Sequence, residues 1–267
     1  REKDWESLAW ALERRVADTS DPKERGKLLQ KLGTTYGDHL DQPAKAAEAW
    51  KRILELDPKN GRALRTLRDS FLRARDWEGL ESLYSETNDW EGLVDVLGTA
   101  AERAENPEDT KALSFRAAFV YVEKLGNAER AFRSYERVLS VDPKNVEAAS
   151  ALVPIYEQQG KWPQVVRMKE LLVASMGDED PATRVAALME LSSLTEKQLG
   201  DDVAAFTWAR GAYTLAPTDS KVGERLESTA AATGAWSELS KCYEGRLAAD
   251  DVGTAEATTL RRRLAVL

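Results

Sequence analysis

Few side chains in this sequence could do acid–base, nucleophilic or metal chemistry. The chain has one histidine, His39, and one cysteine, Cys242, so it cannot form a cluster of imidazoles and thiolates around a metal ion. Carboxylates are plentiful, but adjacent ones such as Asp250 and Asp251 fall in expected loops, where solvation explains them. No glycine-rich phosphate-binding loop follows a strand. The residues therefore predict a protein that is not an enzyme and that carries no cofactor and no metal.

A second group of side chains is suited to binding. Five arginines fall on one expected helix, 60–74, or just beyond it: Arg62, Arg65, Arg68, Arg73 and Arg75. At 100° per residue they share a face of about 160°, opposite an apolar stripe. This face is either solvated and locally paired, or a site for an acidic or phosphorylated protein segment. We take Arg62, Arg65, Arg68 and Arg73 as the candidate partner-binding residues.

The chain repeats itself at long spacing. Asp57-Pro58-Lys59-Asn60 recurs unchanged 85 residues later, and a looser copy begins at Ala216, 74 residues after that. The same offsets relate three tryptophans and three alanines: Trp77, Trp162 and Trp236, and Ala46, Ala131 and Ala205. Similarity at a fixed period is typical of stacked-repeat proteins, in which each unit buries its apolar face against its neighbours.

Apolar residues recur with the period of a helix from end to end, and no strand pattern of useful length is present. Helix-breaking residue pairs such as Asp57-Pro58 separate the helical segments. Fifteen helices are expected, at 4–17, 22–40, 43–56, 60–74, 76–86, 89–105, 108–125, 127–141, 145–159, 162–176, 181–199, 201–215, 219–233, 235–249 and 254–266. The segment 76–105 allows one long helix or two, and Asn88-Asp89 favours a break.

The first copy has Leu32, Gly33 and Tyr36 on one helix, then Ala46, Trp50, Leu54 and Pro58, and this pattern resembles a tetratricopeptide repeat. The second copy has Ala118, Tyr121, Ala131, Tyr135, Leu139 and Pro143; the third has Thr195, Ala205, Trp208, Ala212 and Pro217. In physical terms, the small residues at 46, 131 and 205 let two helices approach closely. The aromatics at 50, 135 and 208 fill the space between one pair and the next.

The resemblance implies an all-α, right-handed α-α superhelix of antiparallel helix pairs. We expect a single such domain over 1–267, as a piece of a longer chain. Its units would be about 1–21 (partial), 22–106, 107–180 and 181–267.

The repeat register also explains the two rare side chains. Cys242 takes the position of Leu83 and Met168, which indicates a place in the core. His39 takes the position of Lys124 and Gln198, which indicates the surface. Trp10 has no aromatic counterpart, and we expect it to contact a preceding repeat.

The composition of the chain restricts the classes of partner that it is expected to bind. The net charge of −8 argues against binding nucleic acid or anionic lipid, and no apolar run approaches the roughly 20 residues that span a bilayer. By default we expect the protein in the cytoplasm, with the periplasm as the alternative compartment. The leading hypothesis is a non-catalytic scaffold that presents a helical groove to a peptide or protein, and the arginine face would suit an acidic one. The alternative is a structural or regulatory arm of a larger enzyme or assembly.

Overall fold

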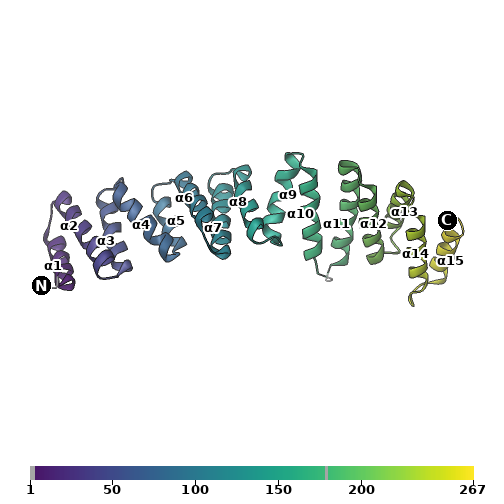
Figure 1. Ribbon diagram of the computed structural model, residues 1–267, viewed down its shortest axis with the longest axis horizontal. Coiled ribbons are helices and arrows are strands. Elements are labelled where there is room, and N and C mark those ends of the chain that lie inside the picture. The colour runs from purple at the N-terminus through teal and green to yellow at the C-terminus, as the bar shows by residue number, and fades with distance from the viewer. Residues whose placement is uncertain (1–3, 178–179) are drawn as a thin grey trace. The chain divides into compact units, whose positions relative to one another are not determined.

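The computed structural model describes residues 4–177 and 180–267, and within these ranges every regular element is a helix (Figure 1). The α-helices are α1 (Trp5–Asp18), α2 (Pro22–Thr34), α3 (Pro43–Leu56), α4 (Gly61–Ala74), α5 (Trp77–Ser85), α6 (Trp90–Arg103), α7 (Pro107–Phe119), α8 (Ala128–Val141), α9 (Val146–Gln158), α10 (Trp162–Ser175), α11 (Pro181–Leu194), α12 (Asp202–Leu215), α13 (Ser220–Thr233), α14 (Trp236–Leu247) and α15 (Thr254–Leu264). None of the described helices is both long and apolar enough to cross a bilayer.

The chain divides into two compact units, one ending at Gly126 and the other starting at Asn127. Within each unit, a helix packs mainly against the next one along the chain, in antiparallel pairs. This confirms the expected all-α fold of sequential helix pairs. The right-handed superhelix and the boundaries of the repeat units stay predictions.

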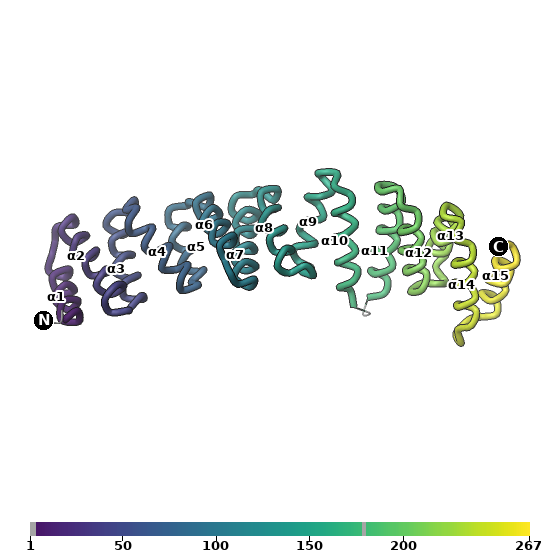
Figure 2. Tube along the Cα trace, in the orientation of Figure 1, coloured from purple at the N-terminus to yellow at the C-terminus, as the bar shows by residue number. Residues whose placement is uncertain are grey.

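The motif Asp-Trp-Glu recurs at Asp4, Asp76 and Asp89, and each occurrence is a helix start. The carboxylates of Asp4, Asp76 and Asp89 accept the backbone N–H of the residue three positions on, at 3.0, 2.9 and 2.9 Å. An N-cap of this kind satisfies one of the free N–H groups at the start of a helix. The break within 76–105 is confirmed, because α5 ends at Ser85 and α6 begins at Trp90. Figure 2 labels α5 and α6 as separate helices along the trace.

Three helices end in a π-helical turn that the periodicity did not predict. These turns are η1 (Thr35–His39) after α2, η2 (Val120–Lys124) after α7 and η3 (Thr195–Leu199) after α11. A left-handed residue follows each turn: Asp41 in the first copy, Gly126 in the second and Gly200 in the third. A second left-handed position closes α4, α9 and α13, at Arg75, Gly160 and Gly234.

The core of the first unit surrounds Leu29, Leu32, Trp50 and Leu67. The second unit has two clusters, one around Leu152 and Val165 and the other around Leu191, Phe206, Leu226 and Tyr243. The small residues Ala46, Ala131 and Ala205 are buried, as expected. One expected aromatic is displaced. The 85- and 74-residue offsets relate Trp50 and Tyr135 to the buried Ala209, while the half-buried Trp208 lies one position earlier.

The three copies match volumes across the contact between the first and second helix of the pair. In the first copy, a Cβ on Gly33 would lie 2.6 Å from the indole nitrogen of Trp50. The corresponding residues are Ala118 and Tyr135 in the second copy, and Ser192 and Ala209 in the third. The residue on the first helix becomes larger as the residue on the second becomes smaller.

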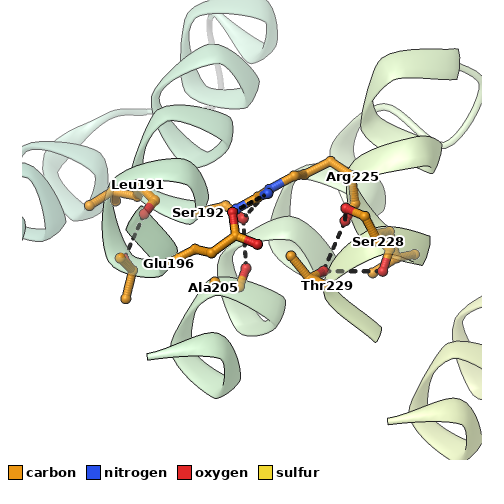
Figure 3. Close-up of polar contacts among 9 residues, drawn as sticks. Leu191, Ser192, Glu196, Ala205, Arg225, Ser228 and Thr229 are labelled. Carbon is orange, nitrogen blue, oxygen red and sulfur yellow. Dashed lines mark hydrogen bonds and ion pairs between the residues drawn. The ribbon is translucent and has the colours of Figure 1, made fainter. Parts of the chain in front are cut away.

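In the third copy a polar network occupies this contact (Figure 3). The buried Ser192 hydroxyl donates to the Ala205 carbonyl at 2.8 Å and accepts from Nε of Arg225 at 2.8 Å. Arg225 also donates to Glu196 at 2.7 Å. One position on the first helix of the pair thus meets Trp50 in the first copy and Arg225 in the third, so Arg225 takes over part of the packing role of the aromatic.

Candidate protein-binding surface on helices α2 to α5

The arginines of α4 do not share one environment. The guanidinium of Arg62 lies 5.7 Å from the centre of the Trp50 ring, and with its amide oxygen facing α4, Gln30 accepts from Nε of Arg62 at 3.1 Å. Arg65 and Arg68 line a separate cavity towards α5. Arg73 is exposed and pairs with none of the described residues. Arg75 pairs with Asp109 of α7 at 2.6 Å, so it ties two helices together.

The first cavity, of about 390 Å³, lies between α2 and the start of α4. Lys23 and Lys27, one turn apart on α2, form one wall, Trp50 and Ile53 of α3 form the floor, and Asn60 lies before α4. We call these residues, with Arg62 beside Trp50, the basic groove. Asp57 also lines the cavity, and its carboxylate accepts from the Lys59 N–H and the Asn60 side chain. Both lysines are exposed, and among the described residues no carboxylate is paired with either. The groove thus offers cationic nitrogens above an apolar floor.

The charge of this region departs from the acidic average of the chain. Residues 22–75 hold thirteen lysines and arginines against seven aspartates and glutamates. In the second copy, Lys23, Lys27 and Arg62 correspond to Glu108, Ala112 and Glu147. Since the repeat architecture does not require these cations, they are free to serve recognition.

The second cavity, of about 350 Å³, lies between α4 and the end of α5. Leu64, Leu83 and Tyr84 provide its apolar surface, the exposed Thr87 lines it beyond the end of α5, and Arg65 and Arg68 line it on the α4 side. We call these six residues the leucine slot. Arg68 pairs with Asp69 at 2.8 Å, whereas Arg65 donates its Nε to the Gly61 carbonyl at 3.0 Å. Burial raises the pKa of Tyr84, and the nearby Arg68 offsets part of this rise.

The sequence singled out the arginines but missed Lys23, Lys27, Leu64 and Tyr84, which complete the two cavities. Comparing copies could have found the lysines, because they too differ from their counterparts. Leu64 and Tyr84 fit the apolar pattern of their helices. Only the three-dimensional arrangement shows that both line a cavity and are only half-buried.

The rare side chains take no part in these cavities. His39 is exposed, as expected, but its ring stacks on Trp5 with centroids 3.7 Å apart. Cys242 is half-buried against the second unit's core, and burial raises the pKa of its thiol. A thiol with a raised pKa is a poor nucleophile at neutral pH. Across the described ranges, no three His, Cys, Asp or Glu side chains are grouped so as to hold a metal ion.

The recurring tryptophans stand at helix starts. Trp77 and Trp162 are half-buried against their cores, which agrees with a packing role, whereas Trp236 is 45% exposed. Trp10 is 59% exposed on α1, where Arg14 lies 4.7 Å from its ring centre.

No family model and no curated protein matches the chain. Solved structures do match it. The structure of MamA is 19% identical (TM-score 0.27), and the match covers 64% of this chain and 88% of that one. PilF of Pseudomonas aeruginosa is 15% identical (TM-score 0.32) over 76% of this chain and 97% of its own. A tetratricopeptide repeat protein of Parabacteroides merdae is 14% identical (TM-score 0.30), over 90% and 86%.

Tetratricopeptide repeat proteins are thus its structural neighbours. At these identities and TM-scores, the likeness says nothing about partners or site residues.

Proposed function

We propose that the chain is a non-catalytic scaffold that binds an acidic protein segment in the basic groove. The observation that carries the proposal is a cavity of about 390 Å³ with Lys23 and Lys27 on one wall above Trp50 and Ile53. Carboxylates would pair with the lysines and Arg62, and apolar side chains would contact the floor. Charged groups of this kind steer association and select partners more than they add affinity.

The test uses a fluorescein-labelled peptide of alternating glutamate and leucine. The groove variant, Lys23→Glu/Lys27→Glu/Arg62→Glu, should bind this peptide at least about tenfold more weakly in fluorescence anisotropy, and the loss should be largest at low salt, where screening is least. The fold should survive, because exposed charges contribute little to stability.

The matched control is Lys197→Glu/Lys221→Glu/Lys241→Glu. It makes the same charge change at exposed positions of the second unit, and Lys221 corresponds to Arg62. It should bind the peptide like the wild type. Equal binding by both triple variants, or equal binding of a lysine–leucine peptide by the wild type, contradicts the proposal.

The second candidate function is that of an arm that packs within a larger assembly, and helix α1 favours it. Leu8 and Trp10 are 42% and 59% exposed on this helix, so it offers an apolar surface to another protein. Under this alternative, Trp10→Lys abolishes assembly, while the groove variant leaves assembly intact.

A further inference from the structure

Helix α5 is shorter than its counterparts. It has 9 residues, whereas α10 and α14, which take the same place in their copies, have 14 and 12. After Ser85 the chain turns through the left-handed Asn88 and starts α6 at Trp90. The start of α4 therefore lacks the last turn of helix that would cover it, and the leucine slot opens there.

The second unit shows what fills this place when the helix is complete. Leu171 and Leu172 of α10 pack against the cluster that contains Ala149 and Met168. These two leucines correspond to Glu86 and Thr87, which are exposed. Ala149 and Met168 correspond to Leu64 and Leu83, the apolar residues of the slot. In the first unit, polar residues thus stand where the second copy has Leu171 and Leu172, whereas the third copy has Gly245 and Arg246 there.

The slot continues into a second apolar cavity. A neighbouring cavity of about 270 Å³ shares Leu64, Leu83 and Thr87 with it and adds Leu54 and Phe71. Together they provide room for more than one large side chain. Among the charged groups around the slot, Asp89 caps α6 and Arg68 pairs with Asp69. Arg65 makes no ion pair with any described residue, so its guanidinium is available to an incoming carboxylate; Lys51, Glu55 and Glu86 lie in the lining of the neighbouring cavity.

We propose that the leucine slot binds a short helical segment of a partner protein that carries two neighbouring leucines and an acidic residue beside them. The leucines would take the places that Leu171 and Leu172 occupy in the second unit, and the carboxylate would pair with Arg65. An amphipathic helix in a groove is a common mode of peptide recognition. This site is separate from the basic groove and does not require it.

The probe is a fluorescein-labelled peptide with the sequence of residues 162–175, which contains Glu170, Leu171 and Leu172. The comparison peptide carries Leu171→Ser/Leu172→Ser. In fluorescence anisotropy with the full chain, the first peptide should bind at least about tenfold more tightly than the second, since two buried leucine side chains are lost. Equal binding of the two peptides would overturn the proposal.

Two variants of the protein locate the site. Thr87→Trp places a large side chain in the slot and should weaken binding of the peptide at least about tenfold. Arg65→Glu should weaken this binding severalfold, because Glu170 of the peptide would then face a like charge. Arg73→Glu makes the same charge change on the same helix, outside the slot, and should leave binding unchanged. Circular dichroism establishes that each variant is folded. Undiminished binding by a folded Thr87→Trp would show that the peptide binds elsewhere.

Two further measurements separate this proposal from its neighbours. The variant Lys23→Glu/Lys27→Glu should still bind the leucine peptide but should no longer bind the glutamate–leucine peptide. Each of the two proposals can therefore fail without the other. Light scattering tests whether a second copy of the chain fills the slot. Self-association that Thr87→Trp abolishes would assign the slot to a second copy and overturn the partner-helix proposal.

Discussion

At the scale of single residues, the contact between Gly33 and Trp50 leaves no room for a side chain on the glycine. A methyl group on Gly33 would lie 2.6 Å from the indole nitrogen, well inside van der Waals contact. Gly33→Ala should therefore lower the free energy of unfolding by about 1–3 kcal/mol, as overpacked cores do. The shift in the urea midpoint measures it.

The second copy supplies the compensating change. Ala118 there stands opposite Tyr135, so Gly33→Ala/Trp50→Tyr should recover much of the stability that Gly33→Ala loses. A single variant that unfolds at the wild-type midpoint, or a double variant less stable than the single one, would show that the indole can move aside.

Arg75 is a second test at this scale. It adopts φ 56°, where the other copies have Gly160 and Gly234, and a side chain in this region costs roughly 1–2 kcal/mol. Arg75→Gly removes this strain together with the ion pair to Asp109, while Arg75→Ala removes only the ion pair. The glycine variant should be the more stable of the two by about 1 kcal/mol, measured as the difference in Tm. The opposite order would mean that the backbone at this position is not strained.

Two buried tyrosines predict that the folded protein becomes less stable in alkali. Burial, together with hydrogen bonds to Glu13 and Glu136, raises the pKa of Tyr36 and of Tyr156 to about 12. An unfolded tyrosine ionises near pH 10. Between about pH 10 and 12 the unfolded chain therefore loses protons that the folded chain keeps, and stability falls as the pH rises. Tm should drop across this range, and Tyr36→Phe/Tyr156→Phe should drop less steeply. Parallel curves for the two proteins would contradict this.

At the scale of the helices, the caps of the repeated Asp-Trp-Glu motif carry a prediction. Asp89 holds the start of α6 through the Gly92 N–H, at the turn that ends α5. Asp89→Ala should lower stability by about 1 kcal/mol, and Asp89→Asn, which keeps an acceptor, by much less. Thermal melts followed by circular dichroism compare the two. A similar loss in both would mean that charge, rather than the hydrogen bond, stabilises the turn.

The helices were predictable from sequence to within a few residues, because caps, prolines and the 3.6-residue period act locally. The break at Asn88-Asp89 was predictable for the same reason. The π-helical turns were not, since apolar residues four positions apart, such as Leu32 and Tyr36, fit an α-helical and a π-helical turn alike. The positions of the arginine side chains on α4 were also only partly predictable from the sequence. Periodicity put Arg62 and Arg65 on one side of α4, but Arg62 lies over Trp50 of α3 while Arg65 lines the cavity towards α5.

At the scale of the whole molecule, each unit has its own buried clusters. Residues 127–267, expressed alone, should give a helical circular dichroism spectrum and a cooperative melt, because the clusters around Leu152 and around Leu191 lie within this range. A spectrum of an unfolded chain would show that this unit depends on the first for its stability.

The matched volumes of the helix pairs also bear on how such a gene can change. Repeated coding sequences invite unequal recombination, which joins the start of one copy to the end of another. A crossover that placed the Ala118 helix before the Trp50 helix would put a methyl group against the indole, and one that placed the Gly33 helix before the Ala209 helix would leave a void. The copies have become parts that no longer interchange. Selection against such hybrids would hold the number and order of the copies fixed.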